Sequence, residues 1–111
     1  MDEIGVEEFD KVEVRVGTIV SAEPNRKARK PAYKLVVDFG PDIGVKTSSA
    51  QIACLYAPED LAGRQAVFCV NLHPMHIGSV RSEVRILGTD SAAGVVLLQP
   101  SMPVADGDRV F

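Results

Sequence analysis

The sequence has little of what membrane spans or disulfide frameworks require. Its longest apolar run, with glycine counted, covers residues 92–98, far below the ~20 residues that cross a bilayer. Its two cysteines, Cys54 and Cys69, form no CxxC pair, so we expect two buried free thiols and a reducing compartment. The acidic start, MDEIGVEEFDK, lacks the basic head and apolar stretch of a secretory signal. We therefore expect a cytoplasmic protein with no membrane insertion.

The common motifs of enzymes and metal sites are also missing. The chain contains no GxSxG, HExxH, GxxxxGK or GxGxxG, and its only histidines are His73 and His76. A catalytic triad built on the hydroxyl cluster of residues 47–49 would need one of these histidines as its base, and a metal site would need more ligands than the pair offers. We expect no catalytic residue, no metal and no cofactor, and hence not an enzyme.

What is present fits one folded domain. The 111 residues are 46% hydrophobic, which is typical of a globular chain and unlike a disordered one. A chain of this length buries roughly 60 to 70 per cent of its extended surface, enough for a single core. There is no internal repeat, low-complexity segment or linker, so residues 1–111 are expected to form a single domain.

Charge is distributed unevenly along the chain. The net charge is −3, but residues 1–13 carry six acids and one base, whereas residues 14–46 carry seven bases and three acids. Salt limits the reach of each charge to about 8 to 10 Å, so the local balance matters more than the total. An acidic protein can therefore present a positive patch.

Apolar residues alternate with polar ones through most of the chain, which predicts β-strands. We expect one long strand over residues 12–24 that bends near Gly17, with further strands over 33–39, 43–47, 65–72, 84–87 and 95–98 and a last one at the C-terminus. The spacing of apolar residues in 48–56 predicts a short helix, and 57–63 a helical turn ended by glycine. The segments NRKARKPA, HPMHIGSVR and GTDSAAG are expected to be loops or turns. Many short strands with few helices favour a small closed antiparallel barrel.

The strongest functional signal is the segment NRKARKPA, residues 25–32, which we call the basic loop. Five cations fall within nine residues with no acid between them: Arg26, Lys27, Arg29, Lys30 and Lys34. The plain alternative is a solvated surface loop. The functional interpretation is a track for phosphates, because each neutralised phosphate releases condensed cations. Tyr33 could stack on a base or belong to the core, and Arg64, Arg81 and Arg85 could extend the track.

Several segments together resemble one known family. FDKVEVRVGTIVSAE, ARKPAYKLVVDFGPDIGVKTSSAQI, LYAPEDLAGRQ, VNLHP, SEVRILG and GVVLLQPSMPV occur in the order and at the separations found in the CsaA-like, secretion-related chaperone branch of the tRNA-binding domain family. The resemblance extends from about Phe9 to the C-terminus. It implies an all-β fold, namely a small OB-fold β-barrel of five main strands with one or two short helices and short terminal extensions, acting as a homodimer.

The resemblance also implies ligand-facing positions. They correspond here to Ser48, Ser49 and Gln51, to Asn71, and to Ser82 and Glu83. Asn71 and Gln51 can both donate and accept hydrogen bonds, although a loop-pinning amide and a barrel-end ion pair are equally compatible with Asn71 and Glu83. Relatives commonly carry an Arg-Arg pair where this chain has Met75-His76, so weaker or pH-dependent RNA binding is expected.

The resemblance implies two non-catalytic functions. The first is binding of tRNA or other structured RNA, for which the expected residues are Arg26, Lys27, Arg29, Lys30, Lys34, Ser48, Ser49, Gln51, Asn71, His76, Arg81 and Ser82. The second is chaperoning of unfolded precursor proteins together with SecA, through an exposed apolar surface at Met75, Ile77 and Val80. For the homodimer contact we expect the apolar residues of the two ends, Ile4, Val6, Phe9, Val110 and Phe111.

Overall fold

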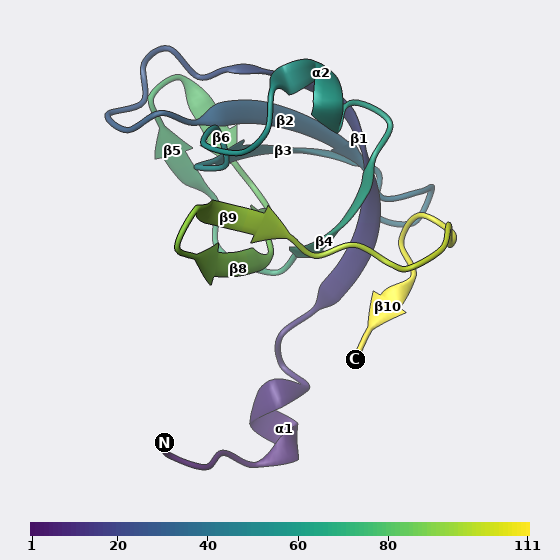
Figure 1. Cartoon of the computed structure of the whole chain (residues 1–111). Coiled ribbons are helices and arrows are strands. Elements are labelled where there is room, and N and C mark those ends of the chain that lie inside the picture. The colour runs from purple at the N-terminus through teal and green to yellow at the C-terminus, as the bar shows by residue number, and fades with distance from the viewer.

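In the computed structural model, which describes Met1–Phe111, a strongly curved antiparallel sheet forms a nearly closed barrel (Figure 1). The strands of this sheet follow the order β3-β2-β1-β4-β7, and β10 pairs with β1. They comprise β1 (Val14–Pro24), β2 (Tyr33–Asp38), β3 (Val45–Ala50), β4 (Gln65–Cys69), β7 (Arg85–Ile86) and β10 (Arg109–Val110). Every pairing in the sheet is antiparallel, as the short, alternating strands predict.

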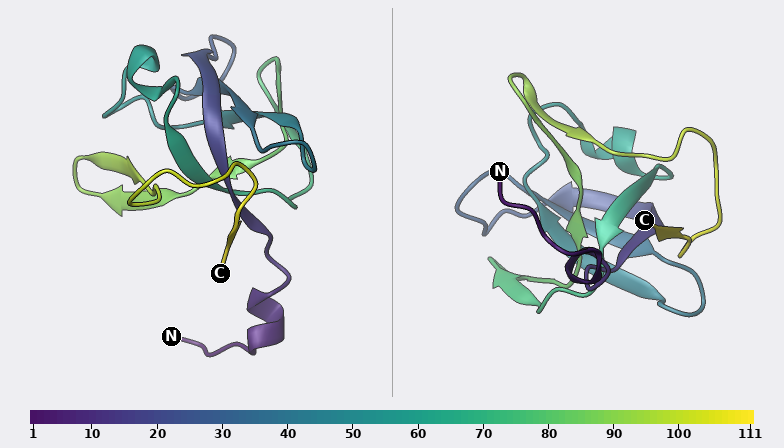
Figure 2. Two further views of the ribbon diagram at one scale, coloured as in Figure 1. Left: turned by 90° about the vertical axis from the view of Figure 1, so that its right-hand side faces the viewer. Right: turned by 90° about the horizontal axis from the view of Figure 1, so that it is seen from below.

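Two hairpins and two short helices complete the molecule. The hairpins are β5 (Met75–Ile77) with β6 (Val80–Ser82), and β8 (Gly88–Ser91) with β9 (Gly94–Leu97). The helices are α1 (Val6–Phe9) and α2 (Pro58–Leu61). Figure 2 shows that α1 and both chain ends lie at one end of the barrel, while the basic loop lies at the opposite end. No helix is long and apolar enough to cross a membrane.

The long strand β1 holds the barrel together because it pairs on both edges. Its first half pairs with β4, from Val14 opposite Cys69 to Thr18 opposite Gln65. Its second half pairs with β2, with a register shift between Ile19 and Ser21. The strand continues through Gly17 without interruption, so the expected irregularity lies a few residues later, at this bulge.

Gly17 allows core side chains to pack directly against the backbone of β1. A Cβ placed at Gly17 would lie 2.6 Å from the Val37 side chain and 2.7 Å from the Phe39 ring. Phe39 in turn packs edge-to-face on Phe68, with ring centroids 5.2 Å apart, at the centre of a core that also contains fully buried Ile19 and Leu35. The missing side chain of Gly17 therefore lets the two phenyl rings reach the middle of the barrel.

The strand predictions for β1, β2 and β4, the helical turn at α2 and the C-terminal strand are confirmed. The helix predicted over residues 48–56 is wrong, because Ser48–Ala50 continue β3, with Ala50 opposite Tyr33 on β2. At the free edge of β2, the backbone N–H and C=O groups of these residues find more hydrogen-bond partners than they would in one short helix.

Two segments expected to be loops or turns form hairpins. HPMHIGSVR contains β5 and β6, which turn at Gly78 with a φ of 62°. GTDSAAG contains β8 and the turn into β9. Strands of three or four residues are too short to show a significant alternation, which explains why the sequence pattern does not reveal them.

The two cysteines differ. Cys69 is a buried free thiol, as expected, but Cys54 is exposed. No group of three or more His, Cys, Asp or Glu side chains is arranged to hold a metal ion.

Candidate functional site

The basic loop is fastened to the barrel at its first residue. Asn25 is 7% exposed, and its Nδ2 donates to Ser49 Oγ at 3.0 Å and to the Ile77 carbonyl at 2.8 Å. Its backbone N–H donates to the Ala32 carbonyl, at the end of the loop. Asn25 therefore joins the basic loop to β3 and to the β5–β6 hairpin, and it fixes where the loop's cations stand.

The hairpin turn approaches the loop closely at Gly78. A Cβ at this glycine would lie 2.8 Å from the Lys27 carbonyl carbon and 2.9 Å from the Ala28 backbone nitrogen. The positive φ of Gly78 is also one that other residues rarely adopt. Glycine is thus required at the hairpin tip both by the turn and by contact with the basic loop.

Between the loop and the hairpin lies a hollow of about 610 Å³, the basic groove. Its cationic and polar walls come from Lys27, Arg29, Lys30, Ser49, Gln51 and His76. No carboxylate lines it. Six residues predicted to bind RNA, drawn from three separate stretches of sequence, therefore surround one space.

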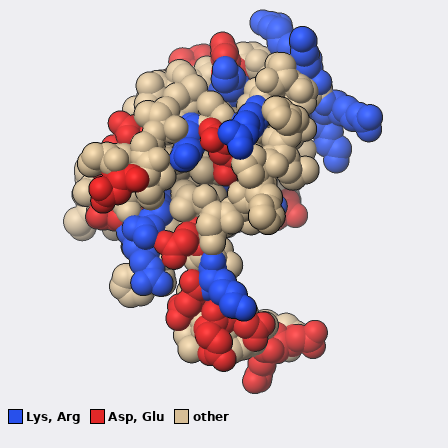
Figure 3. All heavy atoms as spheres, turned by 180° about the vertical axis from the view of Figure 1, so that it is seen from behind, with Lys and Arg blue, Asp and Glu red and all other residues tan.

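The cations of the basic loop have no acidic partner within the molecule. The three ion pairs of the chain join Arg15 to Glu13, Lys34 to Glu23 and Arg81 to Glu83. Arg26, Lys27, Arg29 and Lys30 are exposed and take part in none of them. Figure 3 shows Lys and Arg side chains projecting as one cluster from the end opposite the acidic N-terminal segment. This end can attract a polyanion in spite of the negative net charge.

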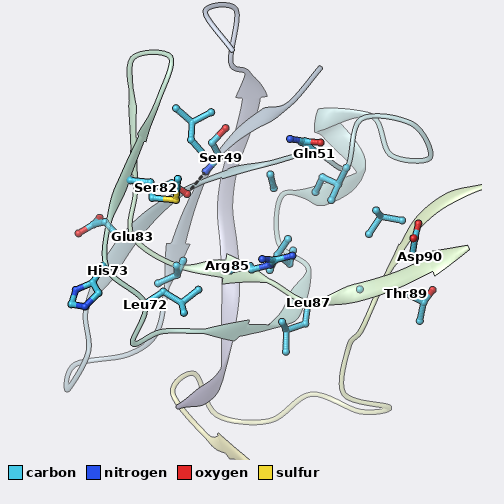
Figure 4. Close-up of a pocket in the computed structure, with 18 residues that line it drawn as sticks. Ser49, Gln51, Leu72, His73, Ser82, Glu83, Arg85, Leu87, Thr89 and Asp90 are labelled. Atoms are coloured by element: carbon cyan, nitrogen blue, oxygen red, sulfur yellow. Dashed lines mark hydrogen bonds between the residues drawn. The ribbon is translucent and has the colours of Figure 1, made fainter. Parts of the chain in front are cut away.

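A second hollow of about 590 Å³, the apolar groove, lies beside the first (Figure 4). Half of its lining is hydrophobic. The lining includes Ile52, Leu72, Met75, Ile77, Ile86, Leu87 and Val95, with the polar residues Ser49, Gln51, His73, Ser82, Glu83, Arg85, Thr89 and Asp90. Because Ser49, Gln51 and Ile77 line both hollows, the two form adjacent parts of one surface.

Glu83 closes the barrel behind the apolar groove. Its Oε1 accepts from the Thr47 backbone N–H at 3.0 Å and from Thr47 Oγ1 at 3.1 Å. The Thr47 backbone hydrogen bond is the largest cause that lowers the pKa of Glu83, and the hydroxyl of Thr47 and the charges of Lys46 and Arg81 add to it, against the opposing effect of burial. The carboxylate therefore stays ionised at neutral pH and links β3 to the segment between β6 and β7.

The serines that were predicted to face the ligand make hydrogen bonds within the protein. Ser49 donates its backbone N–H to Ser82 Oγ at 3.0 Å, while its own hydroxyl accepts from Asn25. Ser48 is 1% exposed, and its hydroxyl donates to the Val84 carbonyl at 2.7 Å. The expectation that Ser48 faces a ligand is therefore wrong, because its hydroxyl is used to close the barrel.

Three other residues that were predicted to bind RNA lie outside the basic groove and already have a partner within the protein. Asn71 is exposed, but its Oδ1 accepts from the Glu13 N–H and its Nδ2 donates to the Lys11 carbonyl, so it pins the N-terminal segment. Lys34 and Arg81 each stand beside an acid. None of these three lines the basic groove.

Two further side chains of the predicted surface are buried. Of the two alternatives for Tyr33, the structure gives the core: it is 9% exposed, and its hydroxyl donates to the Tyr56 carbonyl, so it cannot stack on a base. Val80 is 5% exposed and offers no surface to a peptide. Met75, by contrast, is 65% exposed, and Ile77 is half-buried where it lines both grooves.

The residues from Val14 to Arg109 carry a family signature. A model described as "Putative tRNA binding domain" matches residues 14–109. The chain belongs to the tRNA-binding domain family. Two solved structures support the assignment: the CsaA chaperone protein of Picrophilus torridus is 38% identical with a TM-score of 0.93, covering 98% of this chain and 100% of that one. The chaperone CsaA of Bacillus anthracis is 42% identical with a TM-score of 0.91, covering 99% and 100%.

Enzymes also contain this domain. The methionine–tRNA ligase of Methanoculleus marisnigri is 37% identical over 110 residues, which are 99% of this chain and 16% of the ligase. The ligase of Archaeoglobus fulgidus gives 36% over 109 residues, again 16% of its length. The chain thus spans about a sixth of these curated relatives, and it is similar to a domain within them.

Three residues shape the site in ways that the sequence alone does not predict, namely Asn25, Gly78 and Arg85. Asn25 and Gly78 look like ordinary loop residues, and only the contact between their segments shows that they position the basic loop. Arg85 was considered as an extension of the basic track, yet it lines the apolar groove. The one signal in the sequence that could have pointed to the anchor is an Asn placed directly before a run of cations, since Asn side chains commonly bond to nearby backbone in loops.

Proposed function

We propose that this chain binds tRNA or another structured RNA by placing phosphates in the basic groove. The observation that carries the proposal is the meeting of Lys27, Arg29 and Lys30 around one acid-free hollow. Membership in a tRNA-binding domain family supports the same ligand. Gln51 supplies a side chain that can both donate and accept hydrogen bonds at the edge of this surface.

Binding of this kind is dominated by the phosphates and depends on salt. Each neutralised phosphate releases condensed cations, which contributes a slope of about −0.7 to −0.9 to a plot of log affinity against log salt concentration. With Arg26 beside the groove, four loop cations are available. We therefore expect a slope of roughly −3 if each neutralises one phosphate.

The test is a fluorescence polarisation titration of tRNA at several salt concentrations. The wild type is compared with a triple variant, Lys27→Ala with Arg29→Ala and Lys30→Ala. The matched control replaces three cations elsewhere, Lys11→Ala with Arg64→Ala and Arg109→Ala, and changes the net charge equally. None of the control residues lines either groove. Arg64, considered above as an extension of the track, instead lies over the Tyr56 ring, with its Cζ 5.2 Å from the ring centroid.

The groove variant should lose much of its affinity for tRNA, and its slope of log affinity against log salt concentration should become shallower. The control variant should keep most of the wild-type affinity and of the wild-type slope. Equal losses in the two variants would show that total charge and not the groove determines binding. Absence of binding by the wild type at low salt would contradict the proposal outright.

One observation favours a second candidate function, the holding of unfolded precursor proteins for export together with SecA. Met75 and Leu72 are 65% and 48% exposed and line the apolar groove, and flexible apolar side chains suit varied peptides. Solved structures of similar chains are described as chaperones. If this function holds, an unfolded client aggregates more slowly with the protein present, and Met75→Ser with Leu72→Ser removes the protection.

We also propose that the chain acts in the cytoplasm as a homodimer. Ile4, Val6, Phe9 and Phe111 are 65%, 70%, 51% and 91% exposed. They gather at the end where α1 and β10 project (Figure 1), and apolar groups left in water at this density favour cover by a second copy. Light scattering after size exclusion should give twice the monomer mass of 11.9 kDa, and Phe9→Ser with Phe111→Ser should return the monomer.

A further inference from the structure

We infer that the apolar groove receives one unpaired nucleobase of the RNA whose phosphates lie in the basic groove. The inference rests on the RNA binding proposed above and adds a base-reading subsite to it. Its starting point is the continuity of the two hollows, which share Ser49, Gln51 and Ile77. A strand held by its phosphates on one side of these residues can place a base on the other side.

The size and charge of the groove fit a base and disfavour a phosphate. Its volume of about 590 Å³ lies within the range of about 300 to 1,000 Å³ that is usual for small-molecule sites. Its apolar side chains can cover the faces of a ring. Its lining includes two carboxylates, Glu83 and Asp90, against one permanent cation, Arg85, so it disfavours a phosphate relative to the acid-free basic groove.

Arg85 is the residue placed to stack on the base. It is exposed and takes part in no ion pair and no side-chain hydrogen bond. Figure 4 shows its guanidinium group standing in the groove, between Gln51 and Leu87. Guanidinium planes stack on nucleobases as aromatic rings do. Since Tyr33 is buried, Arg85 takes the place that an aromatic platform has in other RNA-binding surfaces.

The carboxylates determine which bases fit. Both oxygens of Asp90 are free of partners, whereas Glu83 Oε1 is held by Thr47 and its Oε2 lies 3.8 Å from Arg81. A carboxylate accepts hydrogen bonds and donates none, so it favours the amino groups of adenine, cytosine and guanine. Uracil has no amino group and offers only its N3–H, which lies between two carbonyl oxygens that repel a carboxylate, so it is disfavoured. The site therefore selects an unpaired base that carries an amino group.

The test uses an RNA hairpin with either a blunt end or an unpaired extension of adenosines or uridines, titrated against the full chain. The adenosine extension should raise affinity about five-fold or more above that of the blunt hairpin, and the uridine extension should not. Arg85→Lys keeps the charge but loses the planar group, and it should remove most of the gain from adenosines.

The variant Asp90→Asn tests whether Asp90 recognises a base or only repels the RNA by its charge. Removing a negative charge strengthens the binding of any polyanion by electrostatics alone, and Glu59→Gln, on exposed α2 outside both grooves, measures that general effect. If Asp90 reads an amino group, Asp90→Asn weakens the preference for adenosines over uridines, while Glu59→Gln leaves the preference unchanged. Equal effects of the two variants would overturn the base-reading role.

The possible failures are distinguishable. If no hairpin binds, with or without an extension, the proposed RNA function itself is wrong and the subsite falls with it. If all hairpins bind equally and depend on the basic loop, only the subsite is wrong. If Arg85→Lys and Asp90→Asn alter the protection of an unfolded client but not RNA affinity, the groove holds peptide and the inference is overturned.

Discussion

The side-chain amide of Asn25 donates to the carbonyl of Ile77 across 2.8 Å, joining two segments that lie 52 residues apart in the chain. The same amide also reaches Ser49 Oγ. These bonds connect the start of the basic loop to the hairpin that forms the opposite wall of the basic groove. Lys27, Arg29 and Lys30 thereby acquire a defined position across the groove from Gln51 and His76, instead of moving with a free loop.

Asn25→Ala should lower both stability and RNA affinity. The two lost hydrogen bonds from a buried side chain contribute about 1 kcal/mol each to the free energy of unfolding, so we expect a loss of about 2 kcal/mol in a urea titration. RNA affinity should fall although no charge is removed, because the loop loses its anchor. Arg26→Ala, next to it on the surface, is the contrasting variant: it should weaken RNA binding and leave stability nearly unchanged. An Asn25→Ala protein with wild-type RNA affinity would contradict the anchoring role.

Gly78→Ala should destabilise the protein more than Gly44→Ala does. Both glycines have a positive φ, 62° and 83°, which costs an alanine roughly 1 kcal/mol. A Cβ at Gly44 meets nothing within 4 Å, whereas at Gly78 it meets the Lys27 backbone at 2.8 Å. The difference between the two losses in the free energy of unfolding, about 1 kcal/mol or more, measures the contact of the hairpin with the basic loop. Equal losses would show that the loop simply moves away.

Glu83→Gln should remove a pH-dependent part of the stability. The folded pKa of Glu83 is lowered, chiefly by the hydrogen bond from the Thr47 backbone, so the unfolded state binds a proton more readily than the folded one. This stabilisation is fully present above the pKa of an unfolded glutamate, about 4.3, and is lost as the pH falls through the lower folded pKa. Wild type should therefore be more stable than Glu83→Gln at pH 7, and the two should converge in acid. A gap that stays constant down to pH 2 would contradict the assignment.

The cysteines should react at different stages of unfolding. Cys54 is exposed and Cys69 is 5% exposed. In the native protein a maleimide should therefore label Cys54 quickly and Cys69 only when urea unfolds the barrel, as mass spectrometry of the digested protein can show. Cys54→Ser is the control that should leave no fast reaction. Rapid labelling of Cys69 would mean that the edge of β4 opens in the native state.

Local pattern was sufficient to predict much of the barrel. In β2 every second residue, from Tyr33 to Val37, is buried, and this alternation is visible in the sequence because one face of the strand meets the core. The cations of the basic loop are equally visible, since no acid interrupts them. Their freedom from internal ion pairs was the condition for the RNA hypothesis, and it holds for Arg26, Lys27, Arg29 and Lys30 but not for Lys34.

Where prediction failed, a distant partner outweighed the local preference. Ser48 begins the segment predicted to be a helix, yet strand pairing with β2 places it inside the barrel, where its hydroxyl bonds to the Val84 carbonyl. Asn71 looks like a ligand contact, yet both ends of its amide hold the N-terminal segment. A hydroxyl or an amide has the same chemistry in either setting, so its role depends on which backbone group folding brings within reach.

The amino-acid sequence by itself determined the β-rich character of the chain, its uneven charge and the family to which it belongs, because alternation, composition and motif order are properties of the linear chain. Only the tertiary structure decided that the basic loop faces His76 and Gln51 across one groove and that Arg85 and Asp90 enter another. The physical reason is that a binding surface depends on distances between segments far apart in sequence, and these distances are set by barrel closure and by single contacts such as Asn25 to Ile77.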